Sequence, residues 1–237
     1  MKTIKTVGVV GAGTMGSALA QKFIQEGFKV ILADRAMNFA EKGLEMIRSS
    51  LNQGLRKYIF TYEQSSEYLS NLKITDTLTD LKECDLIVEA IYENFKAKTT
   101  LFKELSSMVS SDAILATNTS SFSVTELSTA VSHPERFIGL HYFYHAAKNR
   151  LVEIIPSEKT AEKTIQTAYQ FSIRSGKDPI YSRDAYGFVV NRFFVPWLNE
   201  AVRLYEENVA SIEQIETVCK EVFGITMGPF ELMNVTG

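Results

Sequence analysis

The chain has 237 residues, of which 45% are hydrophobic and 22% are charged, a balance typical of a globular protein with a substantial core. Its net charge of −3 gives no electrostatic basis for binding nucleic acid, and no apolar run is long enough to span a bilayer. Cys84 and Cys219 lack the spacing of metal ligands. We therefore expect no metal site, two core thiols and a reducing, cytoplasmic location.

Strands and helices alternate over the first part of the chain. Apolar runs at residues 6–10, 28–34, 85–90 and 113–121 are typical of buried parallel strands, and the last two end in polar residues. Helical periodicity fills the intervals, for example from Phe39 to Leu55. The alternation predicts an α/β fold with a doubly wound, mostly parallel sheet of the Rossmann type over residues 1–183.

The pattern changes to helices alone over residues 184–237. The run "GFVVNRFFVPWLNEAVRLYEEN" is apolar on nearly every side in its first half, so we expect it to be buried, between domains or subunits. Ser211 and Gln214 have the spacing of a capping box at the start of the next helix. We expect a smaller all-helical C-terminal domain, apparently truncated.

The stretch "VVGAGTMGSALA" contains Gly11, Gly13 and Gly16 in the pattern G-x-G-x-x-G between a predicted strand and helix. Such glycines permit a tight turn and a close approach of the backbone to a pyrophosphate. Asp34 ends the next strand, where a carboxylate can bind both ribose hydroxyls of an adenosine and repel a 2′-phosphate. The motif predicts NAD binding, although Arg35 is a feature of NADP sites. The alternative is a tight turn without a ligand.

His141 ends a predicted strand in "GLHYFYHAAKNRLVE", and Glu153 follows in the middle of the next strand. A lone histidine on an apolar strand is more often a core residue. Here a carboxylate is within reach of the imidazole, and Ser120 ends an earlier strand at the same expected edge. A histidine held by a carboxylate is the usual arrangement of a general base.

Two further polar side chains lie in apolar surroundings. Lys98 lies between Phe95 and Phe102 on a helix that starts near Glu93, and it either extends its amine to water or serves the site. Asn191 lies in an almost wholly apolar helical segment, where its amide needs a partner or a ligand. His133 and His145 have no such support, and we expect them at the surface or in loops.

These motifs, with "VEAIYENFKAK", "ATNTSSFSVTEL", "PERFIGLHYF", "LVEIIP" and "MGPFELM", resemble the L-3-hydroxyacyl-CoA dehydrogenases of fatty-acid β-oxidation and butyrate metabolism along essentially the whole chain. The resemblance implies NAD-dependent oxidation of an acyl-CoA substrate by a homodimer that pairs through its helical domain. It implies roles in catalysis for His141, Glu153, Ser120 and Asn191.

The resemblance also implies the ligand contacts. Those to the cofactor would come from Gly11, Gly13, Thr14, Met15, Gly16, Asp34, Glu93, Lys98 and Ser120. Those to the substrate would come from Ser50, Lys57, Ser120 and Asn191.

The sequence departs from the family where Tyr144 and His145 replace its usual Asn-Pro after the Phe that follows the histidine, and where the chain ends early. Three alternatives remain. One is a related dehydrogenase of a small hydroxy acid or sugar acid without CoA. The second is the 6-phosphogluconate and hydroxyisobutyrate dehydrogenase group, whose catalytic lysine and asparagine pair is absent. The third is a non-enzymatic dinucleotide-binding protein.

Overall fold

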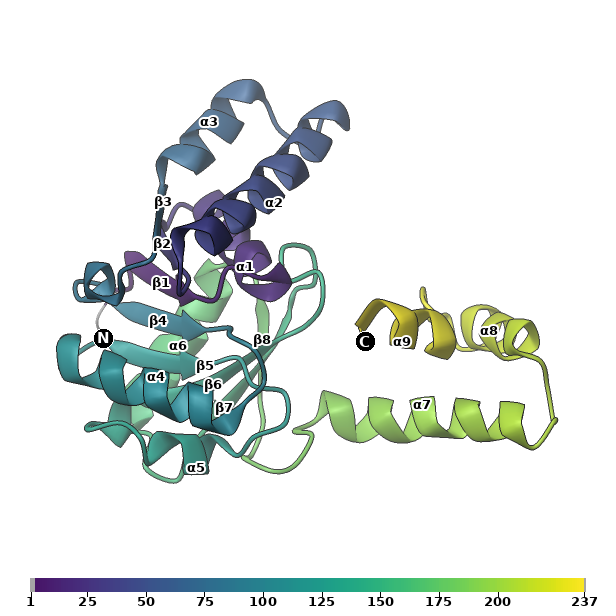
Figure 1. The fold of residues 1–237 in the computed structure, drawn as a ribbon. Helices are drawn as coiled ribbons and strands as arrows, with labels where there is room; N and C mark the ends of the chain where they lie inside the picture. The colour runs from purple at the N-terminus through teal and green to yellow at the C-terminus, as the bar shows by residue number, and fades with distance from the viewer. Residues whose placement is uncertain (1–2, 237) are drawn as a thin grey trace. The chain divides into compact units, whose positions relative to one another are not determined.

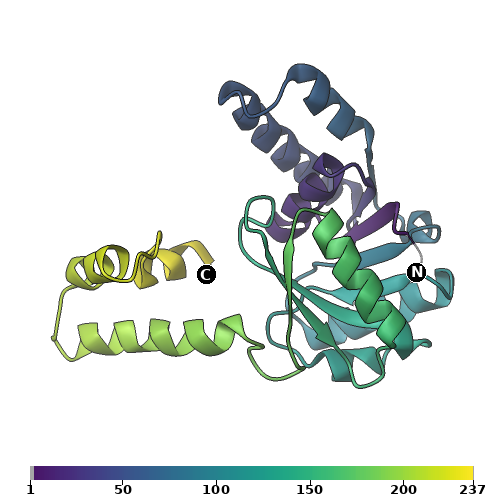
Figure 2. The ribbon, with the colours of Figure 1, turned by 180° about the vertical axis from the view of Figure 1, so that it is seen from behind.

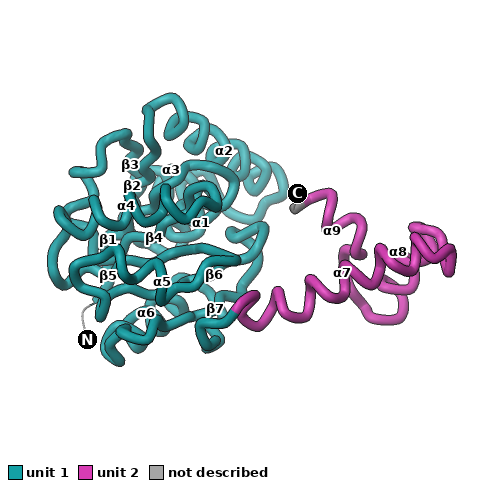
Figure 3. Tube along the Cα trace, turned by 60° about the horizontal axis from the view of Figure 1, so that its bottom comes forward, with its two compact units in different colours: residues 1–185 teal, residues 186–237 magenta. Residues whose placement is uncertain are grey.

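The computed structural model describes residues 3–236 of the chain, which divides into two compact units, residues 1–185 and 186–237 (Figure 3). The sequence pattern predicted a change of architecture after residue 183. Each unit has its own apolar core.

The first unit is built on one sheet, ordered β3-β2-β1-β4-β5-β6-β7-β8 (Figure 1). Its strands are β1 (Thr6–Val10), β2 (Lys29–Ala33), β3 (Leu72–Thr75), β4 (Leu86–Glu89), β5 (Ile114–Thr117), β6 (Phe137–Tyr142), β7 (Leu151–Pro156) and β8 (Asp178–Tyr181). All neighbouring strands are parallel except β6 and β7, which are antiparallel. The predicted doubly wound, mostly parallel sheet is confirmed.

The helices of the first unit connect these strands and cover both faces of the sheet. They are α1 (Thr14–Gln25), α2 (Met37–Arg56), α3 (Tyr62–Ser70), η1 (Leu78–Leu81), α4 (Phe95–Met108), α5 (Val124–Ser128), η2 (Pro134–Arg136) and α6 (Glu162–Arg174). Helices α1 and α6 lie against one face, as the view from behind shows (Figure 2), and α4 and α5 cover the other (Figure 1).

Side-chain alternation in the strands explains where the polar residues lie. On β6, Ile138, Leu140 and Tyr142 face the core beneath α1 and α6. The residues between them face α4 and α5, where Phe137 packs edge-on against Phe102 at 4.8 Å between ring centroids. His141 therefore points to the same side as Phe137, at the carboxyl end of the strand.

The order of the strands creates one position where a ligand site is expected. The chain runs outward from β1 through β2 to β3, and then returns to β4 on the other side of β1. The loops after β1 and β4 consequently diverge and leave a crevice at the carboxyl edge. The glycine motif follows β1 and lies at this point.

The second unit consists of α7 (Val190–Glu206), α8 (Ile212–Glu221) and α9 (Pro229–Thr236). Its small core contains Ala201, Ile215 and Cys219, with Trp197, Leu204, Ala210 and Phe230 packed against them. The predicted capping box of Ser211 and Gln214 is present. Both cysteines are buried free thiols, as predicted.

Within a single chain the helix that begins near Gly187 is largely exposed, and its expected burial between domains or subunits stays a prediction. Ala201 is the buried residue of α7, whereas Phe193 and Val195 are 75% and 59% exposed. The physical reason is that α8 and α9 contact α7 along one side, so its remaining apolar side chains face outward. Within the described residues, no helix combines the length and apolar character needed to cross a membrane.

Candidate functional site

Two glycines of the loop after β1 are required by the protein's own packing. Gly11 has a φ of 103°, and a Cβ there would lie 2.5 Å from the carbonyl oxygen of Ala90. A Cβ on Gly16 would lie 1.7 Å from the carbonyl oxygen of Gly11. Neither position can hold a side chain unless the turn from strand to helix opens.

Gly13 is different, because the protein itself does not exclude a side chain there. Its φ is −73°, and a Cβ would meet no atom within 4 Å. Gly13 is also the residue that precedes α1, so the helix's first backbone N–H groups point toward this open space. The space that a Cβ would occupy, together with these N–H groups, forms a cradle that suits a bound pyrophosphate. The residues present therefore fit a dinucleotide.

Asp34 supports the same loop from the end of β2. Its Oδ2 accepts a hydrogen bond of 2.7 Å from the backbone N–H of Ala12, and its Oδ1 accepts one of 2.7 Å from the backbone N–H of Arg35. The guanidinium of Arg35 lies over the ring of Phe39, 4.7 Å from its centroid. The carboxylate therefore holds the glycine loop in place as well as facing a potential ribose.

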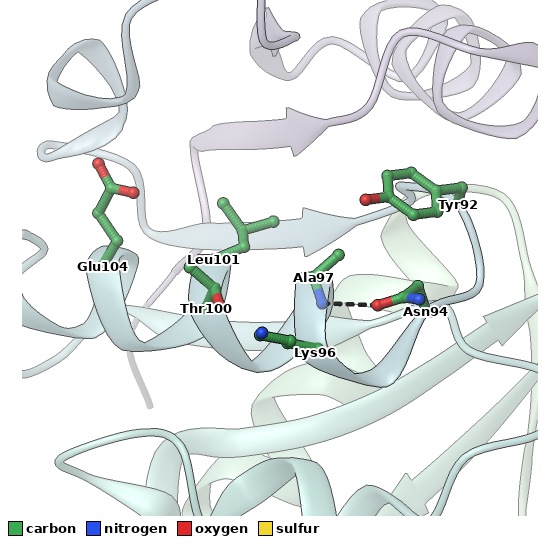
Figure 4. A pocket seen from close by; sticks show the side chains of 7 residues that line it. All are labelled: Tyr92, Asn94, Lys96, Ala97, Thr100, Leu101 and Glu104. Carbon is green, nitrogen blue, oxygen red and sulfur yellow. Dashed lines mark hydrogen bonds between the residues drawn. The ribbon is translucent and has the colours of Figure 1, made fainter.

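A cavity of about 930 Å³ connects the glycine loop, Asp34 and the loop after β4. Its wall continues along α4, which also lines a neighbouring hollow of about 370 Å³. Figure 4 shows the side chains that line this hollow. Tyr92, Ala97, Leu101 and Glu104 line both spaces. Asn94 accepts a hydrogen bond of 2.9 Å from Ala97 N and so begins the helix. This extended, partly apolar crevice suits an adenosine moiety.

His141 and Glu153 form a buried pair across β6 and β7. The two residues are direct partners in the antiparallel register, so their side chains lie on the same face of the sheet. His141 Nδ1 lies 2.6 Å from Glu153 Oε2, and the residues are 5% and 0% exposed. The Glu153 carboxylate fixes the proton on Nδ1 and leaves Nε2 as the nitrogen that can accept one.

A second buried polar cluster lies at the carboxyl ends of β4 and β5. Lys98 Nζ lies 2.5 Å from Glu89 Oε1 and 3.1 Å from Glu93 Oε2. Glu89 also accepts hydrogen bonds from the Thr117 hydroxyl at 2.7 Å and from Ile91 N at 2.9 Å. Burial raises the pKa of Glu89, and the Lys98 ammonium opposes that rise. The alternative in which Lys98 extends its amine to water is wrong, since the residue is 1% exposed.

Glu93 connects this cluster to the loop that carries Ser120. Its Oε1 accepts hydrogen bonds from the Thr119 hydroxyl, from the Ser121 hydroxyl at 2.8 Å and from Ser120 N at 3.3 Å. Burial raises the pKa of Glu93, but the Thr119 hydroxyl and the Lys98 ammonium outweigh it and hold the pKa below its ordinary value. The ionised carboxylate is thus an anchor for the Ser120 loop.

Comparison with known proteins agrees with this arrangement. Residues 6–185 match the family model described as "3-hydroxyacyl-CoA dehydrogenase, NAD binding domain", and residues 187–237 match the corresponding C-terminal domain. The chain belongs to the 3-hydroxyacyl-CoA dehydrogenase family.

Individual relatives in this family cover nearly the whole chain. The mitochondrial hydroxyacyl-coenzyme A dehydrogenase of Sus scrofa is 39% identical over 99% of this chain and 76% of its own length. The 3-hydroxybutyryl-CoA dehydrogenase of Clostridioides difficile is 37% identical over 97% of this chain and 82% of its own. The solved (S)-3-hydroxybutyryl-CoA dehydrogenase of Ralstonia eutropha, 35% identical, has a TM-score of 0.94 and covers 99% of this chain and 83% of that one.

As a member of the 3-hydroxyacyl-CoA dehydrogenase family, the protein is an NAD-dependent oxidoreductase. The cofactor predicted from the glycine motif is therefore confirmed. Thr14 and Met15 lie in the first turn of α1, directly after the open cradle at Gly13. The first of these also lines the cavity.

The remaining predicted site residues, three in number, lie on two helices. Ser50 is half-buried on α2, and Lys57 is the exposed residue that ends this helix, seven positions and about two turns later. Asn191 lies in the first turn of α7, in the second unit. The roles of these three residues remain predictions.

Two residues of the site have no counterpart among the sequence predictions. Glu89 lies at the end of the apolar run "DLIVEA", where a buried acid is unusual enough to be a signal. Thr119 lies within "TNTSS", and its hydroxyl also accepts a hydrogen bond from Phe122 N at 3.0 Å. Its role depends on the loop's conformation, which the sequence alone does not specify.

Proposed function

We propose that the protein interconverts an L-3-hydroxyacyl-CoA and the corresponding 3-oxoacyl-CoA. The observation that carries this proposal is the buried His141–Glu153 pair at the carboxyl edge of the sheet that also bears the dinucleotide loop. NAD, when bound, accepts the hydride that leaves carbon 3 of the substrate.

His141 is the general base in this proposal. In the oxidative direction Nε2 takes the proton of the 3-hydroxyl group, while the C3–H electron pair leaves with the hydride and the carbonyl forms. Glu153 accepts the Nδ1–H throughout and stabilises the imidazolium that results. In the reductive direction the imidazolium returns the proton to the carbonyl oxygen.

Ser120 and Asn191 hold the substrate oxygens in the same proposal. Support for Ser120 comes from the Glu93 carboxylate, which binds the backbone N–H of Ser120 and both neighbouring hydroxyls. An anchored loop keeps a hydroxyl in a reactive position at little entropic cost. The assignment of Asn191 rests on its place in the family's helical motif.

Ser50 and Lys57 bind the CoA portion of the substrate. Their spacing of two helical turns puts both on one side of α2, and the lysine supplies a positive charge for a phosphate. A related dehydrogenase of a small hydroxy acid without CoA would not need this pair. The thioester substrate is therefore favoured over a free acid.

We further propose a cytoplasmic enzyme of fatty-acid metabolism, in β-oxidation or the related butyrate chemistry, that acts as a homodimer. Support for the dimer comes from α7, whose Phe193, Phe194 and Val195 are exposed in a single chain. Such side chains gain roughly 1.5–3 kcal/mol each when they are fully buried. A second copy of the helical unit is the proposed cover.

One assay tests the reaction and its main alternative together. The oxidation of NADH is followed with acetoacetyl-CoA and with free acetoacetate, and the pair of measurements is repeated with NADPH. We expect turnover with acetoacetyl-CoA and NADH and much less with the other combinations. Preference for the free acid would support the alternative enzyme, and no turnover with either substrate would contradict the proposal.

A further inference from the structure

A buried lysine outside the sites described above lies beneath the loop that joins β6 to β7. Lys177 is 3% exposed. Its Nζ donates hydrogen bonds to the carbonyl oxygens of Ala146 and Asn149, the second at 2.6 Å, and lies 5.6 Å from the ring centroid of Tyr142. Two carbonyls and an aromatic face thus surround the ammonium.

No carboxylate within residues 3–236 forms an ion pair with this ammonium. The nearby charges form two ion pairs of their own. Lys22 of α1 pairs with Glu26, the residue that caps this helix, and Arg150 pairs with Asp178. Burial, followed by the charge of Lys22, lowers the pKa of Lys177 to about 8, while Glu26 opposes that change. Burying an ammonium without an ion-pair partner costs free energy. We infer that its hydrogen bonds to the two loop carbonyls have a role in holding the loop.

The loop that Lys177 binds has a conformation that needs such support. His145 has a φ of 54°, in the left-handed region that residues with a side chain rarely adopt. Its carbonyl accepts hydrogen bonds from Lys148 N at 2.6 Å and Asn149 N at 2.8 Å. Left-handed residues of this kind are strained and persist only when the surroundings fix them.

The same loop is directly connected to the proposed base. It follows the strand that bears His141 and precedes the strand that bears Glu153. Phe143, at its start, contacts the imidazole of His141 with 4.5 Å between ring centroids. A shift of the loop therefore displaces a ring that packs on the imidazole.

We propose that Lys177 is a positioning residue of the reaction: its ammonium holds the loop between β6 and β7 and thereby fixes Phe143 against the imidazole of His141. This inference rests on the proposed role of His141 as the base. The inference implies that the position of the His141 imidazole depends on one buried positive charge.

The charge gives the proposal a pH dependence with a definite sign. Below pH about 8 Lys177 is an ammonium, and above it the neutral amine predominates. Hydrogen bonds from a charged donor are roughly twice as strong as neutral ones, and a neutral amine has no cation–π attraction. The loop should therefore loosen as the pH rises through about 8.

Nuclear magnetic resonance of nitrogen-labelled histidine tests this in the unmodified protein without any turnover. The chain has 3 histidines: His141 in the site, His145 in the loop, and His133, which lies elsewhere and pairs with Glu135. We expect the signals of His141 and His145 to show an inflection near pH 8, and those of His133 to show none. Titration curves of His141 and His145 without this inflection would overturn the proposal.

Variants of Lys177 then separate positioning from simple stability. Lys177→Met keeps the apolar stem without the donors, and it should abolish the inflection and lower kcat by about ten- to a hundredfold with little change in the Kd for NADH. Lys177→Arg keeps the charge at high pH, so it should recover turnover relative to Lys177→Met and remove the inflection. Equal kcat in the Met variant and the unmodified protein would contradict the proposal.

The outcomes are distinguishable from failure of the proposed function. If His141 is not the base, kcat is the same in Lys177→Met and in the unmodified protein, but the histidine signals of the unmodified protein still show the inflection. If turnover falls in Lys177→Met while the inflection persists, the effect does not pass through the ammonium. That result would also reject the positioning role.

Discussion

His141 and Glu153 lie directly opposite each other on antiparallel strands, and His141 Nδ1 lies 2.6 Å from the Glu153 carboxylate. The loop between the two strands spans residues 143–150, and both side chains are buried on one face of the sheet. The backbone hydrogen bonds between the two strands thus help to fix the proposed base and its proposed orienting group relative to each other.

The first prediction concerns this pair. Because a general base contributes typically 10²- to 10⁴-fold, His141→Gln should lower kcat by about that factor. Glu153→Gln should also lower kcat strongly, since an amide at Oε2 does not stabilise the imidazolium. Steady-state kinetics with acetoacetyl-CoA measure both effects, and fluorescence of bound NADH checks that the cofactor still binds.

His133 provides the matched control for these two substitutions. It is an exposed histidine that also lies beside a carboxylate, with Nδ1 3.1 Å from Glu135. His133→Gln should leave kcat unchanged. Normal turnover in His141→Gln would show that another group accepts the proton.

Periodicity and motif context were sufficient to predict the class of sheet and most of its strands, though not β3 or β8, and to predict that Glu153 lies within reach of His141. Two apolar strands joined directly by a loop are expected to pair in antiparallel fashion, and side chains of paired residues lie on one face. The Lys98 amine could not be placed in this way. Whether a long side chain extends to water or turns inward depends on where Glu89 lies in the folded sheet, which is a tertiary property.

The exposure of α7 shows a second limit of sequence interpretation. Apolar side chains on nearly every side predicted burial, but burial depends on how many elements pack around a helix. Within the second unit only α8 and α9 contact α7. The sequence pattern of α7 therefore shows that its surface is apolar, but it does not identify the element or partner that covers that surface.

The second prediction separates a glycine required by the fold from one required by the cofactor. Gly16→Ala would put a Cβ 1.7 Å from Gly11 O, so it should lower the free energy of unfolding by about 1–3 kcal/mol or more. Gly13→Ala meets no protein atom and should cost less than about 1 kcal/mol. Thermal or urea unfolding measures both values.

Gly13→Ala, which should have the smaller effect on stability, should nevertheless weaken NADH binding. A methyl group at Gly13 occupies the cradle, so the Kd should rise at least about tenfold, or roughly 1.4 kcal/mol. Unchanged binding by a folded Gly13→Ala variant would mean that the pyrophosphate does not lie there.

The third prediction concerns the buried ion pair of Lys98 and Glu89. Lys98→Met leaves the Glu89 carboxylate buried without its cation, and such a loss costs about 3–5 kcal/mol. The double variant Glu89→Gln with Lys98→Met removes the unpaired charge and should recover a large part of that stability. Urea unfolding of the two variants gives the comparison.

Activity should not recover in the same double variant. Lys98 also pairs with Glu93, which anchors the Ser120 loop, so stability can return while that anchor remains weakened. Full recovery of kcat would show that the network is structural and has no part in positioning Ser120.

The last prediction concerns the choice between NAD and NADP. A 2′-phosphate beside the Asp34 carboxylate meets like charge, which costs several kcal/mol, so the protein should prefer NADH strongly. Removing Asp34 altogether would confuse this effect with loss of the loop, because Asp34 Oδ2 also accepts a hydrogen bond from Ala12 N. Asp34→Asn is therefore the sharper change, since an amide oxygen can keep that bond without the charge. We expect it to narrow the ratio of kcat/KM for NADH over NADPH by about ten- to a hundredfold, with Arg35 then available to a phosphate. A preference for NADPH in the unmodified protein, or an unchanged ratio in the variant, would reject this role of the carboxylate.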